Sequence, residues 1–283
     1  MGVCESASNE QREDPNKIGA IENPESFQPG SEMHQINIPV SKTIKSLCKV
    51  ITPNKDIASG FLIKFFKDQQ DFFCLMTNEH AITKELIEKE ETIIFYYDSE
   101  SKMRKIQLNP EERFIKEFTD MNIDATVIEI LPKDKIPEDY FLTVLLDYLY
   151  NYKKLIGQKI TIIQYPKGEP NYSNGLIKYL TQDGKYEFAH GASTLEGSSG
   201  SPIFLKNNIK VIGIHHGGQK DNSQNYGFFI GPIYNYFKNF SKNNLVVDED
   251  DKVKTEESKR IQKENILDYN KEANIESDVS TSN

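Results

Sequence analysis

Short runs of β-branched and aromatic residues recur through the middle of the chain, and they constrain its fold more than any other feature. Gly, Pro, Asn and Asp separate these runs, as turn residues separate strands. Many short strands at regular spacing predict an all-β sandwich or barrel. The runs expected to be strands are TIKSLCKVI (43–51), SGFLIKFF (59–66), DFFCLMT (71–77), ETIIFYYD (91–98), IDATVIEIL (123–131), QKITIIQYP (158–166), NGLIKYL (174–180), YEFAHGAST (186–194), SPIFL (201–205), KVIGIHH (210–216) and YGFFIG (226–231).

Two segments have a different pattern. EDYFLTVLLDYLYNYKKL (138–155) is too long and continuous for one strand, so we expect a helix there. GPIYNYFKNF (231–240) predicts a second helix, which closes the domain.

Both ends of the chain contain few apolar residues. Glu, Asn, Ser, Gln and Pro are frequent in residues 1–38, and Asp, Glu, Lys and Asn in residues 244–283. Such segments bury too little apolar surface to offset the entropy lost on ordering. We therefore expect a disordered N-terminal segment, a folded domain over 39–243, and an acidic, mostly disordered tail with a short helix near 257–275.

Charge and cysteine content exclude several function classes. The chain has 34 Lys and Arg against 43 Asp and Glu, a net charge of −9, without a basic run. Phosphate binding needs clustered positive charge, so no nucleic-acid partner is expected. The three cysteines, Cys4, Cys48 and Cys74, are odd in number and irregularly spaced. They support neither a disulfide framework nor a zinc site, and we expect no metal or organic cofactor.

The N-terminal sequence bears on localisation. It shows no secretory signal, and no segment approaches the roughly 20 apolar residues of a membrane span, so we expect an intracellular, cytoplasmic protein. MGVCES matches M-G-x-x-x-[ST], the pattern for myristoylation of Gly2. One such chain binds membranes only marginally, so Cys4 would have to carry a second, thioester-linked chain. The alternatives are peripheral attachment to a membrane through Gly2 and Cys4, and an unmodified terminus that happens to begin Met-Gly.

One turn carries a candidate nucleophile. TLEGSSGSPIF (194–204) lies between two expected strands and holds three serines. A nucleophilic serine needs a base, a group that orients the base, and donors for the oxyanion. His80 directly follows the apolar strand of CLMTNEHAI, and Asp124 begins the strand IDATVIEIL. A partly buried carboxylate needs a partner, which a histidine N–H supplies.

The blocks MTNEHAI, NIDATVIEI and GSSGSPIF resemble the three signature blocks of trypsin-like, chymotrypsin-fold serine peptidases. The pattern is most similar to the disulfide-poor branch of glutamyl endopeptidases and the HtrA protease domain, which SGFLIK, IIQYPKG and VIGIHHGG also resemble. The resemblance covers about residues 40–240. It implies two six-stranded antiparallel β-barrels, over about 39–135 and 156–243, and a polypeptide substrate.

The resemblance also implies residue roles. Ser199 is the nucleophile, His80 the general base and then acid, and Asp124 the residue that fixes the imidazole tautomer. The backbone N–H groups of Gly197 and Ser199 form the oxyanion hole. Ser198 and Ser201 are the neighbours of the nucleophile. The hydrolase elbow G-x-S-x-G is rejected, because it needs glycine where Ser201 stands and a strand–turn–helix setting.

Substrate-facing residues are implied just before the nucleophile and on the strand after it. They are Thr194 and the segment His215, His216, Gly217 and Gly218. In glutamyl endopeptidases a Thr and a His at positions matching Thr194 and His215 hold an acidic P1 side chain. A hydroxyl and an imidazole both donate to a carboxylate, so the same preference is expected here.

Two other functions stay open at this point. One is an inactive peptidase-fold binding module, and the other is a membrane-tethered adaptor in which the tails carry the function. Each site residue taken alone also has a structural explanation, since Gly/Ser/Pro clusters are usually turns. The sequence does not settle the oligomeric state.

Overall fold

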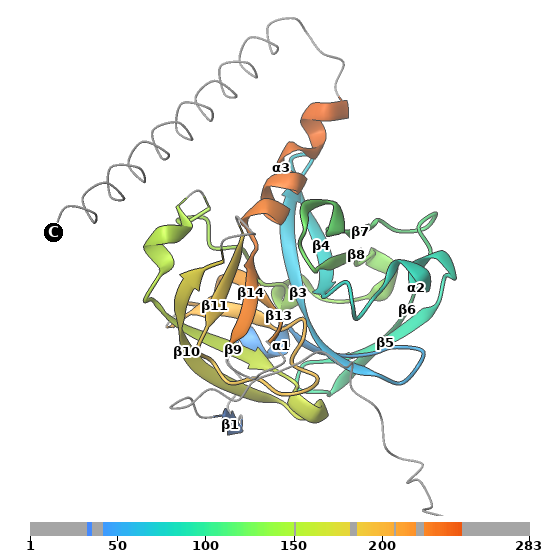
Figure 1. The fold of residues 1–283 in the computed structure, drawn as a ribbon. Helices are drawn as coiled ribbons and strands as arrows, with labels where there is room; N and C mark the ends of the chain where they lie inside the picture. The colour runs from blue at the N-terminus through green and yellow to red at the C-terminus, as the bar shows by residue number, and fades with distance from the viewer. Residues whose placement is uncertain are drawn as a thin grey trace, which may run out of the picture. The chain divides into compact units, whose positions relative to one another are not determined.

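The computed structural model describes residues 33–35, 42–149, 151–181, 186–206, 208–218 and 224–244. The chain divides into two compact units, Met1–Lys238 and Asn239–Asn283, and residues 239–244 are the described part of the second. Two antiparallel sheets make up the first unit, as Figure 1 shows.

The first sheet has seven strands in the order β6-β5-β2-β3-β4-β8-β7. No pairing among the described residues joins its edge strands β6 and β7, so it forms a half-barrel instead of the closed six-stranded barrel that was expected. Its strands are β2 (Leu47–Ile51), β3 (Ile57–Lys67), β4 (Gln70–Thr77), β5 (Thr92–Tyr97), β6 (Lys102–Gln107), β7 (Ile115–Glu117) and β8 (Thr126–Glu129).

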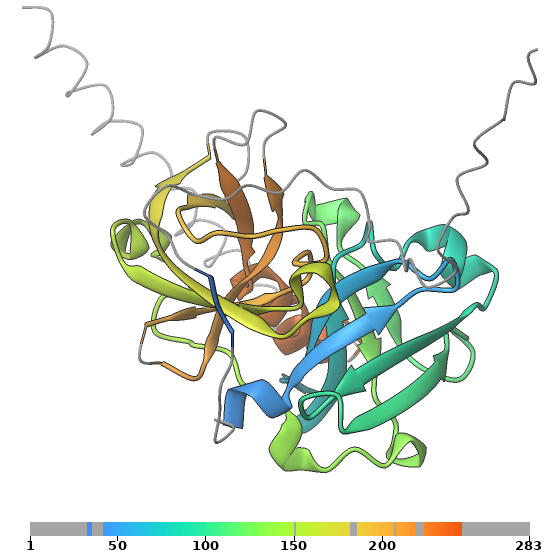
Figure 2. The same ribbon diagram turned by 90° about the horizontal axis from the view of Figure 1, so that it is seen from below.

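The second sheet closes into a six-stranded barrel, because β10 pairs with both β9 and β11. A seventh strand, β1 (Met33–Gln35), adds to β10 at residues 171–173, as Figure 2 shows from below. This strand interrupts the segment 1–38 that was predicted to be disordered, and the rest of that segment lies outside the described residues. The barrel strands are β9 (Lys159–Gln164), β10 (Asn171–Leu180), β11 (Glu187–His190), β12 (Pro202–Leu205), β13 (Val211–Gly218) and β14 (Asn225–Phe229).

The all-β, chymotrypsin-like architecture with a C-terminal helix is confirmed. The predicted helix at 231–240 is α3 (Gly231–Asn244). Phe237 of this helix lies among aromatic side chains of the first sheet, with ring centroids 4.6 Å from Phe65 and 5.3 Å from Phe72. None of the helices in the described ranges is long and apolar enough to cross a membrane. The remaining helices are short: α1 (Lys42–Lys45), α2 (Lys84–Glu88) and the 3-10 turns η1 (Thr119–Met121), η2 (Pro132–Asp134), η3 (Glu138–Tyr140), η4 (Tyr152–Leu155) and η5 (Pro166–Gly168).

The helix predicted at 138–155 is wrong. Only its ends are helical, as the turns η3 and η4, and the described residues between them form two β-bridges and a turn at 147–149. Leu142 forms a parallel bridge to Ile63 of the first sheet, and Val144 forms one to Val211 of the second. This segment contacts both sheets, so apolar residues are favoured on both of its sides. The resulting apolar run is continuous and was mistaken for a helix.

Candidate active site

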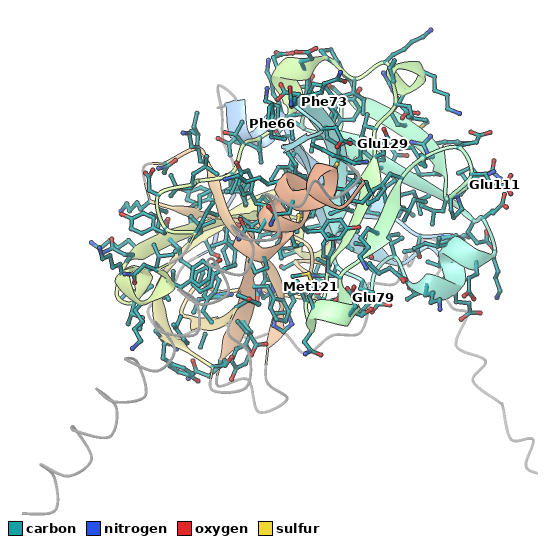
Figure 3. All side chains as sticks on the ribbon, turned by 90° about the horizontal axis from the view of Figure 1, so that it is seen from above. Phe66, Phe73, Glu79, Glu111, Met121 and Glu129 are labelled. Atoms are coloured by element: carbon teal, nitrogen blue, oxygen red, sulfur yellow. The ribbon has the colours of Figure 1, made fainter. Side chains whose placement is uncertain are left out.

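His80 and Asp124 lie at the same end of two paired strands. β4 ends at Thr77, which pairs with Thr126 at the start of β8. His80 follows the end of β4, and Asp124 precedes the start of β8. The two strands are antiparallel, so the two segments meet at one edge of the first sheet. Figure 3 labels Glu79 and Met121, which precede His80 and Asp124 in the chain.

The Asp124 carboxylate holds the His80 ring from one side. Its Oδ2 lies 2.6 Å from His80 Nδ1, while its Oδ1 accepts the backbone N–H groups of Glu79 at 2.8 Å and His80 at 3.1 Å. Burial raises the pKa of Asp124, but the hydrogen bond and charge of His80 outweigh it, and the net pKa is lowered. An ionised carboxylate only accepts hydrogen bonds, so the ring proton lies on Nδ1.

Asn78 also anchors this corner, and sequence reasoning missed it. Its side-chain amide donates to the Asp124 carbonyl at 2.6 Å. The residue stands inside the block MTNEHAI, two positions before His80, and this place was its signal in the sequence. The structure adds that Asn78 is buried.

The turn that carries Ser199 is hydrogen-bonded to both sheets. Ser59 N–H of β3 donates to the Ser199 carbonyl at 2.8 Å, and Gly200 N–H donates to the His215 carbonyl of β13 at 2.9 Å. Thr77 Oγ1 donates to the Ser59 carbonyl at 2.8 Å. These bonds tie Ser199 through Ser59 to the strand end that leads to His80. Ser199 itself is only 2% exposed.

Ser59 anchors the peptide that joins Gly197 to Ser198, and its role was also missed. Its buried hydroxyl donates to the Gly197 carbonyl at 2.8 Å and accepts the Tyr165 N–H at 2.9 Å. Gly197 has φ +91°, and a Cβ there would lie 2.7 Å from the Tyr165 carbonyl oxygen. Within the described residues no acceptor bonds the Gly197 N–H. The Gly197 N–H shares its peptide plane with the Glu196 carbonyl, which accepts the Lys167 N–H at 2.6 Å. The plane of the expected oxyanion donor is therefore held at its carbonyl side by Lys167, and the peptide that follows is held by Ser59. In the sequence, Ser59 is marked only by its place as the first residue of the block SGFLIK.

Replacing Ser59 with alanine tests this orientation. We expect a loss of about 2–4 kcal/mol in the free energy of unfolding, because two buried backbone groups lose their partner. Peptide hydrolysis should fall as well, since the peptide between Gly197 and Ser198 loses its anchor next to the expected oxyanion donors. Denaturant unfolding and kcat/KM of the same preparation measure both effects. Ser173→Ala is the matched control, because among the described residues its buried hydroxyl makes one long contact, 3.4 Å from Gln164 Nε2. Equal losses in the two variants would contradict the assignment.

Gly200 has a backbone conformation and a contact that only glycine fits. Its φ is +87°, and an added Cβ would overlap the Ser59 carbonyl oxygen and lie 2.6 Å from Thr77 Oγ1. Gly200→Ala is expected to cost about 3 kcal/mol or more of unfolding free energy, from backbone strain and overlap together. Gly157→Ala is the control, because Gly157 has φ +79° but no atom within 4 Å of an added Cβ. Thermal unfolding of both variants should separate the two effects. Gly157→Ala reports backbone strain alone, and the additional loss in Gly200→Ala reports the steric overlap.

Thr194 and His215 are both fully buried next to the nucleophile turn. Thr194 lies in the loop after β11, and its Oγ1 has no hydrogen-bond partner among the described residues. The preceding residues of the loop are held from two strands, because Asn225 Nδ2 donates to the Ala192 carbonyl at 2.8 Å and Gln164 Nε2 to the Ser193 carbonyl at 3.0 Å. His215 Nδ1 lies 2.9 Å from the Tyr226 carbonyl oxygen of β14.

Strand β13 has a register shift between His215 and Gly217, and its last residues are His216, Gly217 and Gly218. The His216 ring stacks on Phe228 at 4.4 Å between centroids, and its Nε2 lies 2.8 Å from Glu187 Oε1. Burial raises the pKa of Glu187, but its hydrogen bond with His216 gives a net lowering. The His216 side chain is thus held against the barrel wall by β11 and β14.

The remaining sequence predictions fall outside this site. Gly2 and Cys4 lie outside the described residues, so their acylation stays a prediction. Cys48 and Cys74 are buried free thiols, and burial raises the pKa of each well above its ordinary value. Across the described residues no group of three or more His, Cys, Asp and Glu side chains is arranged to hold a metal ion.

Solved structures share this fold at low sequence identity. A Glu endopeptidase is 15% identical over 80% of this chain and 100% of its own, with a TM-score of 0.52. The VesB protease of Vibrio cholerae is 12% identical over 74% and 67%, with a TM-score of 0.53. A serine endoprotease from Yersinia pestis is 13% identical over 71% and 67%, with a TM-score of 0.50. Comparison with the curated proteins gives no match.

The family is shown by sequence. The model of the trypsin-like peptidase domain matches residues 58–214, more than half of the chain. The match begins in β3 and ends in β13, so it takes in His80, Asp124 and Ser199. The chain therefore belongs to the trypsin-like peptidase family and is a serine endopeptidase.

Proposed function

We propose that His80, Asp124 and Ser199 form the catalytic triad of this endopeptidase. The observation that carries the proposal is the 2.6 Å contact between His80 Nδ1 and an Asp124 carboxylate that also accepts two backbone N–H groups. This contact keeps the Nδ1 proton in place and leaves Nε2 as the basic nitrogen of the ring. Nε2 is the atom that must take the serine proton.

With these three roles, the proposed reaction runs as a serine-peptidase acyl transfer. Ser199 Oγ attacks the scissile carbonyl carbon while its proton passes to His80 Nε2. The N–H groups of Gly197 and Ser199 stabilise the oxyanion. The C–N bond then breaks, and His80 returns the proton to the leaving amine. Water, deprotonated by the same nitrogen, hydrolyses the acyl ester and restores Ser199.

We also propose that the enzyme prefers an acidic P1 residue, bound by Thr194 and His215. A buried hydroxyl without a partner costs about 1–3 kcal/mol, so the unpaired Oγ1 of Thr194 favours a polar ligand. His215 supplies an imidazole that matches a carboxylate in charge when it is protonated, whereas His216 contacts Glu187.

Two measurements on the full chain test the two proposals separately. A fluorophosphonate probe should label Ser199 and leave Ser199→Ala unlabelled; an unlabelled wild type would favour the inactive binding module instead. Cleavage of a peptide library should be enriched in Glu and Asp at P1. Labelling without that enrichment would overturn the acidic preference and keep the triad.

A further inference from the structure

The second barrel has two ends, and the proposed active site occupies one of them. The turn that carries Ser199 enters β12 at Pro202. At the other end of the same strands, β12 ends at Leu205, β13 begins at Val211 and β9 begins at Lys159. The strands β9, β10 and β13 can be followed in Figure 1. We call the surface formed by residues 145–149, 151–159, 176, 205–206 and 208–211 the distal face.

Backbone hydrogen bonds hold the segments of the distal face side by side. The Lys206 N–H donates to the Lys159 carbonyl at 2.8 Å, and Lys159 pairs with Leu176 across β9 and β10. Beyond β12, the Leu145 N–H donates to the carbonyl of Val211, the first residue of β13, at 2.9 Å. Three stretches that are far apart in the sequence therefore form one surface.

The distal face holds most of the exposed large apolar side chains in the described part of the chain. Seven such side chains are exposed there, and four of them lie on this face: Leu146 (47% exposed), Ile156 (44%), Leu176 (45%) and Ile209 (60%). Single exposed apolar residues are ordinary, whereas a group of them rimmed by polar residues marks an interaction site for a protein or a membrane. The distal face therefore has the character of a docking surface.

The same face is rich in lysine. Residues 145–159 and 205–211 include five lysines, all exposed, and one carboxylate, that of Asp147, which gives a local charge of 5 − 1 = +4. The net charge of the whole chain is −9, so this face has the opposite sign. The sequence shows no basic run, because the lysines come from two separate stretches that the barrel brings together. They are Lys153, Lys154, Lys159, Lys206 and Lys210.

We propose that the distal face docks on a bilayer that contains anionic lipids. Such a bilayer offers the lysines a negative surface and the aliphatic side chains an apolar interior, so it matches both components of this face. The excess of negative charge elsewhere on the chain is repelled by the same surface, which sets the orientation of the bound enzyme. The turn that carries Ser199 then faces away from the bilayer, since it lies at the opposite end of β12. The proposal does not need acylation of Gly2 and Cys4, which stays a separate prediction.

The test uses the full-length protein with Gly2→Ala and Cys4→Ser, so that no acyl chain contributes. Its cosedimentation is measured with vesicles of phosphatidylcholine, with and without phosphatidylserine. We expect binding to the vesicles that contain phosphatidylserine alone, and we expect added salt to weaken it. Lys206→Ala combined with Lys210→Ala should weaken binding about 30-fold, because each lysine near an anionic surface contributes about fivefold. Ile209→Ser should weaken it about tenfold, through the loss of apolar contact.

Matched controls change the same residue types elsewhere. Lys55→Ala combined with Lys105→Ala removes two exposed lysines of the first sheet and its turns, and Met103→Ser removes an exposed apolar side chain there. Both controls should bind vesicles like the unsubstituted protein, and thermal unfolding shows that every variant is folded.

The possible results separate the proposal from its alternatives. Absence of binding to phosphatidylserine vesicles overturns it, and so do equal losses in the distal-face variants and their controls. Retention on immobilised polyglutamate without vesicle binding would assign the face to an acidic protein partner and overturn the membrane assignment. These readouts need no peptidase activity, so their failure leaves the proposed function untouched.

Discussion

Ser199→Ala is expected to lower kcat/KM for peptide hydrolysis by about a millionfold, the scale seen when a triad nucleophile is removed. The reason is that no other hydroxyl in the turn is placed to replace it. Ser198 Oγ accepts the Leu195 N–H at 3.2 Å, and Ser201 Oγ donates to the Ser198 carbonyl at 2.6 Å. Both side chains are fully buried in the bonds that shape the turn.

Ser198→Ala and Ser201→Ala are the matched controls. Each removes one buried hydroxyl from the same turn, so each is expected to lower the free energy of unfolding by about 1 kcal/mol and to retain fluorophosphonate labelling. Single-turnover kinetics separate loss of chemistry from loss of folded protein. If Ser199→Ala kept activity within a hundredfold of wild type while Ser201→Ala lost it, the nucleophile would be Ser201.

The sequence was sufficient for the parts of the fold that have a local signature. The alternation of runs and turns predicted most of the strands, and the blocks around His80, Asp124 and Ser199 pointed to a candidate site because each combines a strand end with a chemically distinctive residue. The strand β6, KMRKIQ, was missed since its charged residues hide the period of two. The segment 138–155 was misassigned because burial on two sides removes the polar face that distinguishes a strand from a helix.

Contacts between distant segments were not predictable in the same way. Ser59 is 138 residues from Gly197 in the chain, and nothing in either segment reports that they share a hydrogen bond. His190 and His215 are 25 residues apart, on strands that are not neighbours in the sheet order, with β14 between them. Only the closed barrel brings the two rings together, so their contact emerges from the structure and not from the sequence.

Asp124→Asn should lower kcat by about 10⁴-fold with little change in the position of its neighbours. The amide oxygen can still accept the backbone N–H groups of Glu79 and His80 that now bind Oδ1. The amide nitrogen then faces His80 Nδ1 as a donor. Nδ1 must become the acceptor, and the ring proton moves to Nε2, where it blocks transfer from Ser199. Asp120→Asn is the control, because Asp120 is an exposed carboxylate close in sequence that pairs with Lys116 at 2.9 Å.

The difference in unfolding free energy between the wild type and Asp124→Asn should depend on pH. The folded pKa of Asp124 is lowered, so ionised Asp124 stabilises the wild type above its unfolded pKa, about 3.9, and this contribution is lost as pH falls through the folded value. The asparagine variant has no such contribution at any pH. The difference in unfolding free energy between the two proteins should therefore be largest near neutral pH and shrink on acidification. Thermal unfolding from pH 7 down to about pH 3 measures it, and a difference that stayed constant would mean that Asp124 is not the ionised partner of His80.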